Sequence, residues 1–181
     1  EVDSLQVPAT FYTINSAYNN NNFIIVINGD ETFQVTLPDG NYSIDELIIY
    51  FNRTVFSTEW DAAGLSITRP AIGGQKRNIL VAKYLTSTGK FLISVDNDVN
   101  PGQITGLSID FMRPSGSTYT SNTGWSSDIV SGDIQTRLGW MLGYRNASYS
   151  GSTAYPGEAA IDICGPKSVS YTHLTLPTRL S

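Results

Sequence analysis

The chain has 181 residues, of which 40% are hydrophobic and only 15% are charged. This length allows one domain with a substantial core, and the composition is that of an ordered chain rather than a disordered one. The net charge is -5, and the basic side chains are not clustered. Because nucleic-acid binders need basic patches and membrane-spanning helices need about 20 apolar residues in a row, we expect no nucleic-acid and no membrane partner.

The first part of the chain indicates extended structure. Residues 5–14 carry spaced apolar side chains around Pro8, which predicts an edge strand or an extended arm. Residues 23–27 are continuously apolar and predict a strand buried on both faces. Residues 32–37 alternate apolar and polar side chains and predict a second strand, joined to the first by a turn at residues 28–30.

A helix is predicted at residues 44–56. Ser43 and Glu46 have the spacing of a capping box, in which each side chain bonds the backbone of the other residue. One side of this helix is apolar and consists of Ile44, Leu47, Ile48, Phe51 and Val55. We expect this side to pack onto a sheet and to bury Phe51.

Strand patterns dominate the next segments. Residues 65–68, 79–85 and 90–95 predict strands, and residues 87–89 have the composition of a turn between the last two. Apolar side chains continue over residues 104–111, with strict alternation in the second half of that range. Together these segments predict a β-meander.

The part of the chain after residue 114 predicts a loop, a helix and a strand. Residues 115–127 are rich in Ser, Thr, Gly and Asn and predict a surface loop. Residues 134–142 predict a second helix, capped by Asp133 and stopped by Gly143, and residues 159–164 predict a last strand. The expected fold class is mainly β, either a β-sandwich or an α+β domain, with two short inserted helices.

Catalytic groups are scarce in this sequence. His173, the only histidine, lies in the segment at residues 169–178 that is interpreted below as non-native, so no imidazole-based triad can be assembled. Cys164 is the only cysteine, and without a second cysteine or a histidine it offers no zinc site. Residues 73–76 lack the glycine spacing of a phosphate-binding loop. We therefore expect no catalytic residues, no cofactor and no metal, and we do not expect an enzyme.

The acidic residues do not change this expectation. Residues 96–100 superficially resemble a calcium loop, but Pro101 and Leu107 stand where such a loop needs Gly and Glu. Asp110 and Asp162 lie in alternating segments and are expected to face outward. The third hypothesis is a hydrolase that uses carboxylates alone, and the sequence does not favour it, because no acid pair is placed by spacing.

Trp125 and Tyr119 are the candidate ligand-binding residues. Both lie in the polar loop, where aromatic side chains among small polar residues suit a stacking platform for a sugar ring. The alternative is that they cover the core. Trp60 and Trp140, in contrast, are expected to be packing residues.

The end of the chain has a separate interpretation. Residues 169–178 resemble the translation of an adapter used in transposon-based sequencing libraries. A segment of that origin would not belong to the natural fold. We therefore expect one β-rich domain at residues 1–168, truncated at both ends, and a non-native tail at residues 169–181.

Four motifs follow one another along the chain. A strand, a Gly-Asn-Tyr turn and a capped helix occupy residues 32–52, followed by Thr-Gly-Lys-Phe at 88–91, Leu-Gly-Trp-Met-Leu-Gly-Tyr at 138–144 and Ile-Asp-Ile-Cys-Gly-Pro-Lys at 161–167. This ordered set, within residues 5–167, resembles capsid-associated structural proteins of large DNA viruses that infect algae and protists. The resemblance implies a minor capsid, penton-like or attachment protein, and it brings no catalytic residues.

Two functional hypotheses follow. The first is a virion structural protein, located in the virus particle, that contributes to capsid assembly or surface decoration by self-association or by contacts with other capsid proteins. The second is a carbohydrate-binding or adhesin domain that uses Trp125 and Tyr119 to bind a host-surface glycan. A sizing experiment and a glycan array separate the two.

Overall fold

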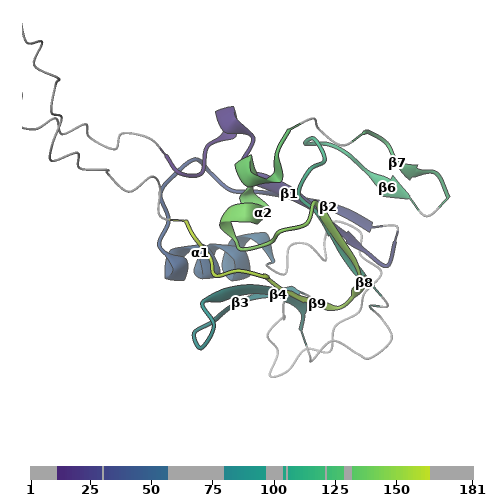
Figure 1. The fold of residues 1–181 in the computed structure, drawn as a ribbon. Helices are drawn as coiled ribbons and strands as arrows, with labels where there is room; N and C mark the ends of the chain where they lie inside the picture. The colour runs from purple at the N-terminus through teal and green to yellow at the C-terminus, as the bar shows by residue number, and fades with distance from the viewer. Residues whose placement is uncertain are drawn as a thin grey trace, which may run out of the picture.

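The computed structural model describes residues 12–29, 31–56, 80–96, 104, 106–120, 122–128 and 132–163. Within these ranges the chain is mainly antiparallel β-structure with two short helices, which confirms the expected fold class (Figure 1). Several expectations fall outside these ranges. They concern the arm before Tyr12, Trp60, the strand at 65–68, the loop at 73–76, Asp98 with Asn100, and every residue from Cys164 onward.

The larger sheet has four antiparallel strands in the order β2-β1-β5-β8. The strands are β1 (Asn22–Ile27), β2 (Glu31–Thr36), β5 (Leu107–Asp110) and β8 (Ser148–Ser152). Ile25 of the central strand β1 pairs with Phe33 on one side and with Ile109 on the other. All side chains from Phe23 to Ile27 are at most 3% exposed, which confirms that this strand is buried on both faces.

The smaller sheet has three antiparallel strands, in the order β3-β4-β9. The strands are β3 (Leu80–Leu85), β4 (Lys90–Val95) and β9 (Ala154–Pro156). The predicted hairpin between β3 and β4 is confirmed, and Gly89 takes the positive φ of 69° that closes its turn. Only Thr153 separates β8 from β9, so the chain passes directly from the edge of one sheet to the edge of the other.

One helix spans the end of the core between the two sheets (Figure 1). It consists of α1 (Ile44–Tyr50) and of a wider π-helical turn, η2 (Phe51–Val55). The Phe51 ring lies 6.0 Å from that of Phe23 in the larger sheet and 5.3 Å from that of Phe91 in the smaller sheet. The expected burial of Phe51 is therefore confirmed, and this ring joins both sheets to the helix.

The capping box at the start of α1 is also confirmed. The Glu46 amide donates to Ser43 Oγ at 3.2 Å, and Glu46 Oε2 accepts from the Ser43 amide at 2.8 Å. Replacing Ser43 by Ala is expected to lower the free energy of unfolding by about 1 kcal/mol, because one amide of the first turn loses its acceptor. Urea unfolding of both proteins measures this difference, and an unchanged midpoint would contradict it.

The same cap makes part of the stability pH-dependent. Hydrogen bonds from the backbone and side chain of Ser43 hold the pKa of the Glu46 carboxyl below its ordinary value of 4.5. A carboxyl whose pKa is depressed by folding contributes stability above its unfolded pKa and loses it as the pH falls through the folded pKa. We expect unfolding at several pH values to show a smaller acid-induced loss for Glu46→Gln than for the wild type over that interval.

An asparagine covers the outer edge of β3. Asn52 Nδ2 donates to the Ala82 carbonyl at 2.8 Å, and Asn52 Oδ1 accepts from the Ala82 amide at 2.9 Å. Among the described strands, β3 has only β4 as a neighbour. The side chain therefore bonds the backbone groups that a further strand would otherwise pair with.

The expected continuous helix at residues 134–142 is wrong. The structure has a 3-10 turn, η4 (Ile134–Thr136), and a single α-turn, α2 (Leu138–Met141), separated by Arg137 in an extended conformation. Arg137 is buried, and its guanidinium donates to the Asn19 carbonyl at 3.1 Å beside the short helix η1 (Ser16–Tyr18). The cap by Asp133 and the stop at Gly143, whose φ is +95°, are both confirmed.

The expected strand at residues 159–164 is wrong over the described residues 159–163. The backbone there bonds in turn to Gly143, Gly89 and Met141, so no two successive bonds go to the same strand. Ile163 is buried. The apolar alternation at residues 159–163 therefore reflects burial against several elements and not pairing in a sheet. The strands in this region are β8 and β9, which have few apolar residues.

Candidate functional site

The outer face of the larger sheet is covered by its own chain. Ile24 and Val26 alternate with the core residues of β1 and do not belong to the core cluster, yet they are only 0% and 3% exposed. Over this face lies the segment 113–128, which we call the flap; within it, residue 121 is outside the described ranges. The expected surface loop therefore contains an ordered hairpin, formed by β6 (Tyr119–Thr120) and β7 (Gly124–Trp125).

Asp110 holds the base of the flap. Its Oδ1 accepts from the amides of Met112 at 2.8 Å and Arg113 at 3.0 Å, and its Oδ2 lies 3.3 Å from Arg113 Nε. Asp110 is 4% exposed, so the expectation that it faces water is wrong. Alternation correctly places it on the outer face, but the flap covers that face.

Three further contacts fasten the flap to the sheet and to itself. The Gly116 amide donates to Gln34 Oε1 at 2.8 Å, and the Tyr119 amide donates to Thr32 Oγ1 at 2.9 Å. Arg113 Nη1 donates to the Ser127 carbonyl, which ties the two ends of the flap together. Both ends and the middle of the flap are therefore fixed.

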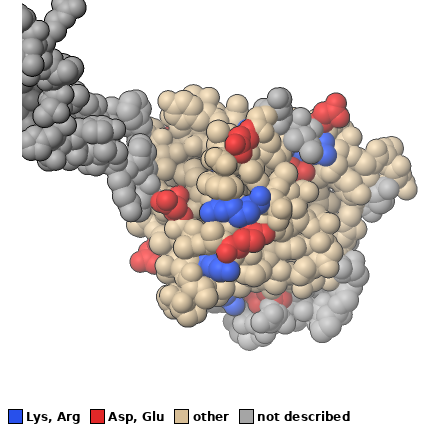
Figure 2. All heavy atoms as spheres, viewed as in Figure 1, with Lys and Arg blue, Asp and Glu red and all other residues tan. Residues whose placement is uncertain are grey.

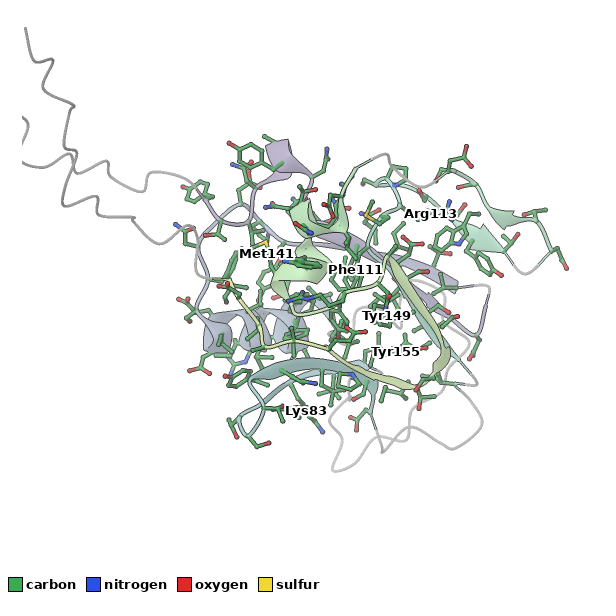
Figure 3. All side chains as sticks on the ribbon, in the orientation of Figure 1. Lys83, Phe111, Arg113, Met141, Tyr149 and Tyr155 are labelled. Carbon is green, nitrogen blue, oxygen red and sulfur yellow. The ribbon has the colours of Figure 1, made fainter. Side chains whose placement is uncertain are left out.

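The structure brings the two expected ligand-binding residues together. Tyr119 and Trp125 are paired across the hairpin, their rings are 5.2 Å apart, and both side chains are half-buried. The Arg113 guanidinium lies 4.8 Å from the centre of the Trp125 ring. Figure 3 shows Arg113 beside the hairpin. Trp125 is therefore held in place by Arg113 and forms a fixed wall.

A hollow of about 300 Å³ lies between the flap and the sheet. It is lined by Val26, Gly29, Ser108, Ile109, Asp110, Arg113, Tyr119, Trp125, Ser148, Tyr149 and Ser150. This volume is at the lower end of the range for small-molecule sites, about 300 to 1,000 Å³. The hollow combines aromatic walls with hydroxyl groups and one ion pair, which is a composition that binds small polar molecules.

Tyr149 fixes the strand at the edge of the hollow. Its hydroxyl donates to Glu158 Oε1 at 2.7 Å and accepts from the amides of Arg145 and Asn146 at 2.9 and 3.0 Å. Burial raises the pKa of the Tyr149 phenol. The phenol therefore stays protonated at neutral pH and keeps donating to Glu158.

Comparisons of the chain with protein-family models, with curated proteins and with solved structures found no match.

Sequence reasoning missed most of this site. Asp110 and Arg113 have the i, i+3 spacing of a local ion pair, but the alternation around Asp110 suggested exposure to water. Ser148 and Ser150 belong to a Ser-Tyr-Ser-Gly-Ser stretch with the composition of a loop. Only the strand pairing of Ser148 with Asp110 brings these residues to the hollow.

Asn41, Asn146 and Trp140 do not line the hollow. Asn41 Oδ1 accepts from the Thr13 amide at 2.7 Å, so it has a structural role. The side chain of Asn146 is exposed and donates to Glu158 at 3.2 Å. Trp140 is half-buried and packs against Arg145, whose guanidinium lies 3.8 Å from the centre of its ring.

The described ranges contain neither a metal-binding cluster nor a membrane-spanning helix. No group of three or more His, Cys, Asp or Glu side chains in those ranges could hold a metal ion. None of the helices described there is long and apolar enough to cross a bilayer.

Proposed function

We propose that this chain is a structural component of a virus particle that contributes to capsid assembly or surface decoration. The ordered motif set supports the proposal, because its described residues build the core of this fold. Leu47, Phe51, Phe91, Leu138 and Tyr144 come from three of the four motifs, and each is 0% exposed. Residues that build a core are the ones that proteins of a common fold have to keep, so the proposal rests on the scaffold and not on a site.

The partners would be copies of this chain or other capsid proteins. On the face shown in Figure 2 most of the surface is uncharged, while charged side chains of both signs adjoin one another near its middle and others are isolated. Protein interfaces are depleted of charged residues at their centres, so the uncharged parts of this face suit contacts between subunits.

Proteomics of purified particles tests this proposal. Particles of a virus whose genome encodes the chain should contain its peptides at a stoichiometry that remains constant through gradient purification. Sedimentation of the isolated protein should also show association that increases with concentration. Peptides found only in the lysate of infected cells, and not in particles, would contradict the proposal.

We propose sugar binding as a second function, which the hollow specifically favours. Tyr119 and Trp125 form an aromatic wall, and Ser108, Ser148 and Asp110 bring hydroxyl and carboxylate oxygens to the same space. Sugar sites combine an apolar wall for the C–H face of a ring with polar groups for its hydroxyls. The two functions are compatible, because a particle component that binds glycans is an attachment protein.

The hollow supports binding rather than hydrolysis. Asp110 is the only carboxylate among the residues that line it, and both of its oxygens already accept hydrogen bonds. Hydrolysis of a glycoside ordinarily needs two carboxyl groups about 5 to 10 Å apart. We therefore propose that the domain is not an enzyme.

A glycan array is the test of sugar binding. The wild type should bind a restricted set of glycans, and Trp125→Ala should lose that signal because the wall of the hollow is removed. Trp140→Ala is a matched control, since that indole also stacks on an arginine but lies outside the hollow. Equal loss in both variants, or no signal for the wild type, would contradict this function.

A further inference from the structure

The charges of the hollow restrict which sugar it can take. Asp110 and Arg113 are the only charged side chains among its lining residues, and they pair with each other at 3.3 Å. Their charges cancel. A ligand that enters the hollow therefore meets a site with no net charge.

Arg113 is already committed to the protein. Its Nε contacts Asp110, its Nη1 donates to the Ser127 carbonyl, and the guanidinium lies over the Trp125 ring. The contacts to Asp110 and Ser127 use one N–H of Nε and one of Nη1, two of the five guanidinium donors. A carboxylate ligand that bound the other donors would share Arg113 with Asp110, whose buried negative charge repels it. An acidic sugar is therefore disfavoured.

A cationic ligand is disfavoured for the corresponding reason. Asp110 already accepts from the amides of Met112 and Arg113 and from the Arg113 side chain. An ammonium group would compete with these three donors, and it would also lie close to the fixed positive charge of Arg113. The ion pair therefore selects against both signs of charge.

The uncharged groups of the hollow match a ring that carries several hydroxyls. Ser108 on β5 and Ser148 and Ser150 on β8 belong to neighbouring strands of one sheet, and each serine hydroxyl can both donate and accept. Tyr119 and Trp125 stand opposite on the flap. A pyranose ring has this distribution, with hydroxyls around its edge and C–H groups on its face.

We infer that the hollow binds a neutral pyranose, one or two rings in size, and discriminates against acidic and amino sugars. This inference rests on the proposed sugar-binding function and deepens it. The aromatic pair packs against the face of the ring, the serines of β5 and β8 bind its hydroxyls, and the Asp110–Arg113 pair acts as a positioning pair that holds the wall and keeps the site neutral.

NMR titration of the full chain tests the inference with defined probes. The neutral probes are the methyl glycosides of glucose, galactose and mannose; the acidic probes are glucuronic acid and N-acetylneuraminic acid; the cationic probe is glucosamine. A Trp125→Phe variant assigns the indole N–H signal of Trp125. At least one neutral glycoside should shift that signal, with the same affinity at 50 mM and 500 mM NaCl, while the charged probes bind at least tenfold more weakly.

Variants then locate the site. The double variant Ser148→Ala, Ser150→Ala should weaken binding of the neutral glycoside several-fold without changing the fold, because both side chains are exposed on the edge strand. Trp125→Phe, which keeps an aromatic wall, should retain more affinity than Trp125→Ala. Trp140→Ala should leave the affinity unchanged.

The possible failures can be distinguished. If an acidic sugar binds more tightly than every neutral one, and its affinity falls as salt rises, the inference is overturned while sugar binding stands. If no probe shifts the Trp125 signal and the glycan array is also empty, sugar binding itself fails. If a neutral glycoside binds but the serine double variant is unaffected, the ligand lies elsewhere and the assignment of the hollow is overturned.

Discussion

Replacing Phe51 by Ala is expected to lower the free energy of unfolding by about 3 to 5 kcal/mol, the usual cost of deleting a buried phenyl ring. Phe51 is 0% exposed, and its ring lies 5.3 to 6.0 Å from those of Phe23, Phe56 and Phe91. The cavity would therefore open where the helix and both sheets meet. Movement of a single neighbouring element could not fill it. Urea or guanidinium unfolding followed by circular dichroism measures the loss.

The matched control is Ile49→Ala on the same helix. Ile49 is 49% exposed, and substitutions at such surface positions usually change stability by no more than about 0.5 kcal/mol. A similar loss in both variants would show that the effect comes from helix propensity and not from the core.

Replacing Gly143 by Ala is expected to cost about 2 to 5 kcal/mol, as the sum of a left-handed backbone penalty and of overpacking. Gly143 has a φ of +95°, and a Cβ there would lie 2.3 Å from the Ala159 carbonyl oxygen. That neighbour is backbone, held by the bond from the Ala159 amide to the Gly143 carbonyl at 3.0 Å. The substitution therefore has to break a chain contact between the end of α2 and the segment after β9.

Gly151→Ala separates these two causes. Gly151 also has a positive φ, +86°, but no atom lies within 4 Å of its Cβ position. This variant should lose only the backbone part, about 1 to 2 kcal/mol. If Gly143→Ala loses no more than Gly151→Ala in the same denaturant titration, the predicted clash with Ala159 is wrong.

The elements that the sequence predicted well are those specified by local chemistry. Ser43 and Glu46 satisfy each other's backbone, so the start of α1 can be read without any tertiary information. The continuous apolar run from Phe23 to Ile27 has to be buried on both faces, and it is. The turn at residues 87–89 likewise requires a positive φ at its last position, and Gly89 adopts it without strain.

The elements that were missed depend on contacts between distant parts of the chain. Arg137 interrupts an apparent helix because its guanidinium reaches the Asn19 carbonyl. Strand β8 contains three serines and a glycine, and pairing with β5 stabilises it despite its low strand propensity. No periodicity in the sequence carries this information.

The candidate site shows the same division. Tyr119 and Trp125 were found from the composition of their loop, since exposed aromatics stand out among small polar residues. Asp110 and Arg113 were not found, because the flap covers the outer face through contacts with distant parts of the chain. The sequence therefore identified the aromatic pair of the hollow, but neither the serines of the sheet nor the Asp110–Arg113 ion pair.

The asparagine at the edge of β3 has a consequence for the behaviour of the protein at high concentration. An uncovered strand edge is a template on which another molecule can add a strand, and repeated addition leads to fibrous polymers. Because Asn52 bonds both backbone groups of Ala82, the middle of this edge cannot accept an incoming chain. At high protein concentration the Asn52 side chain would thus hinder fibrous polymerisation through this edge, while leaving contacts through other surfaces possible.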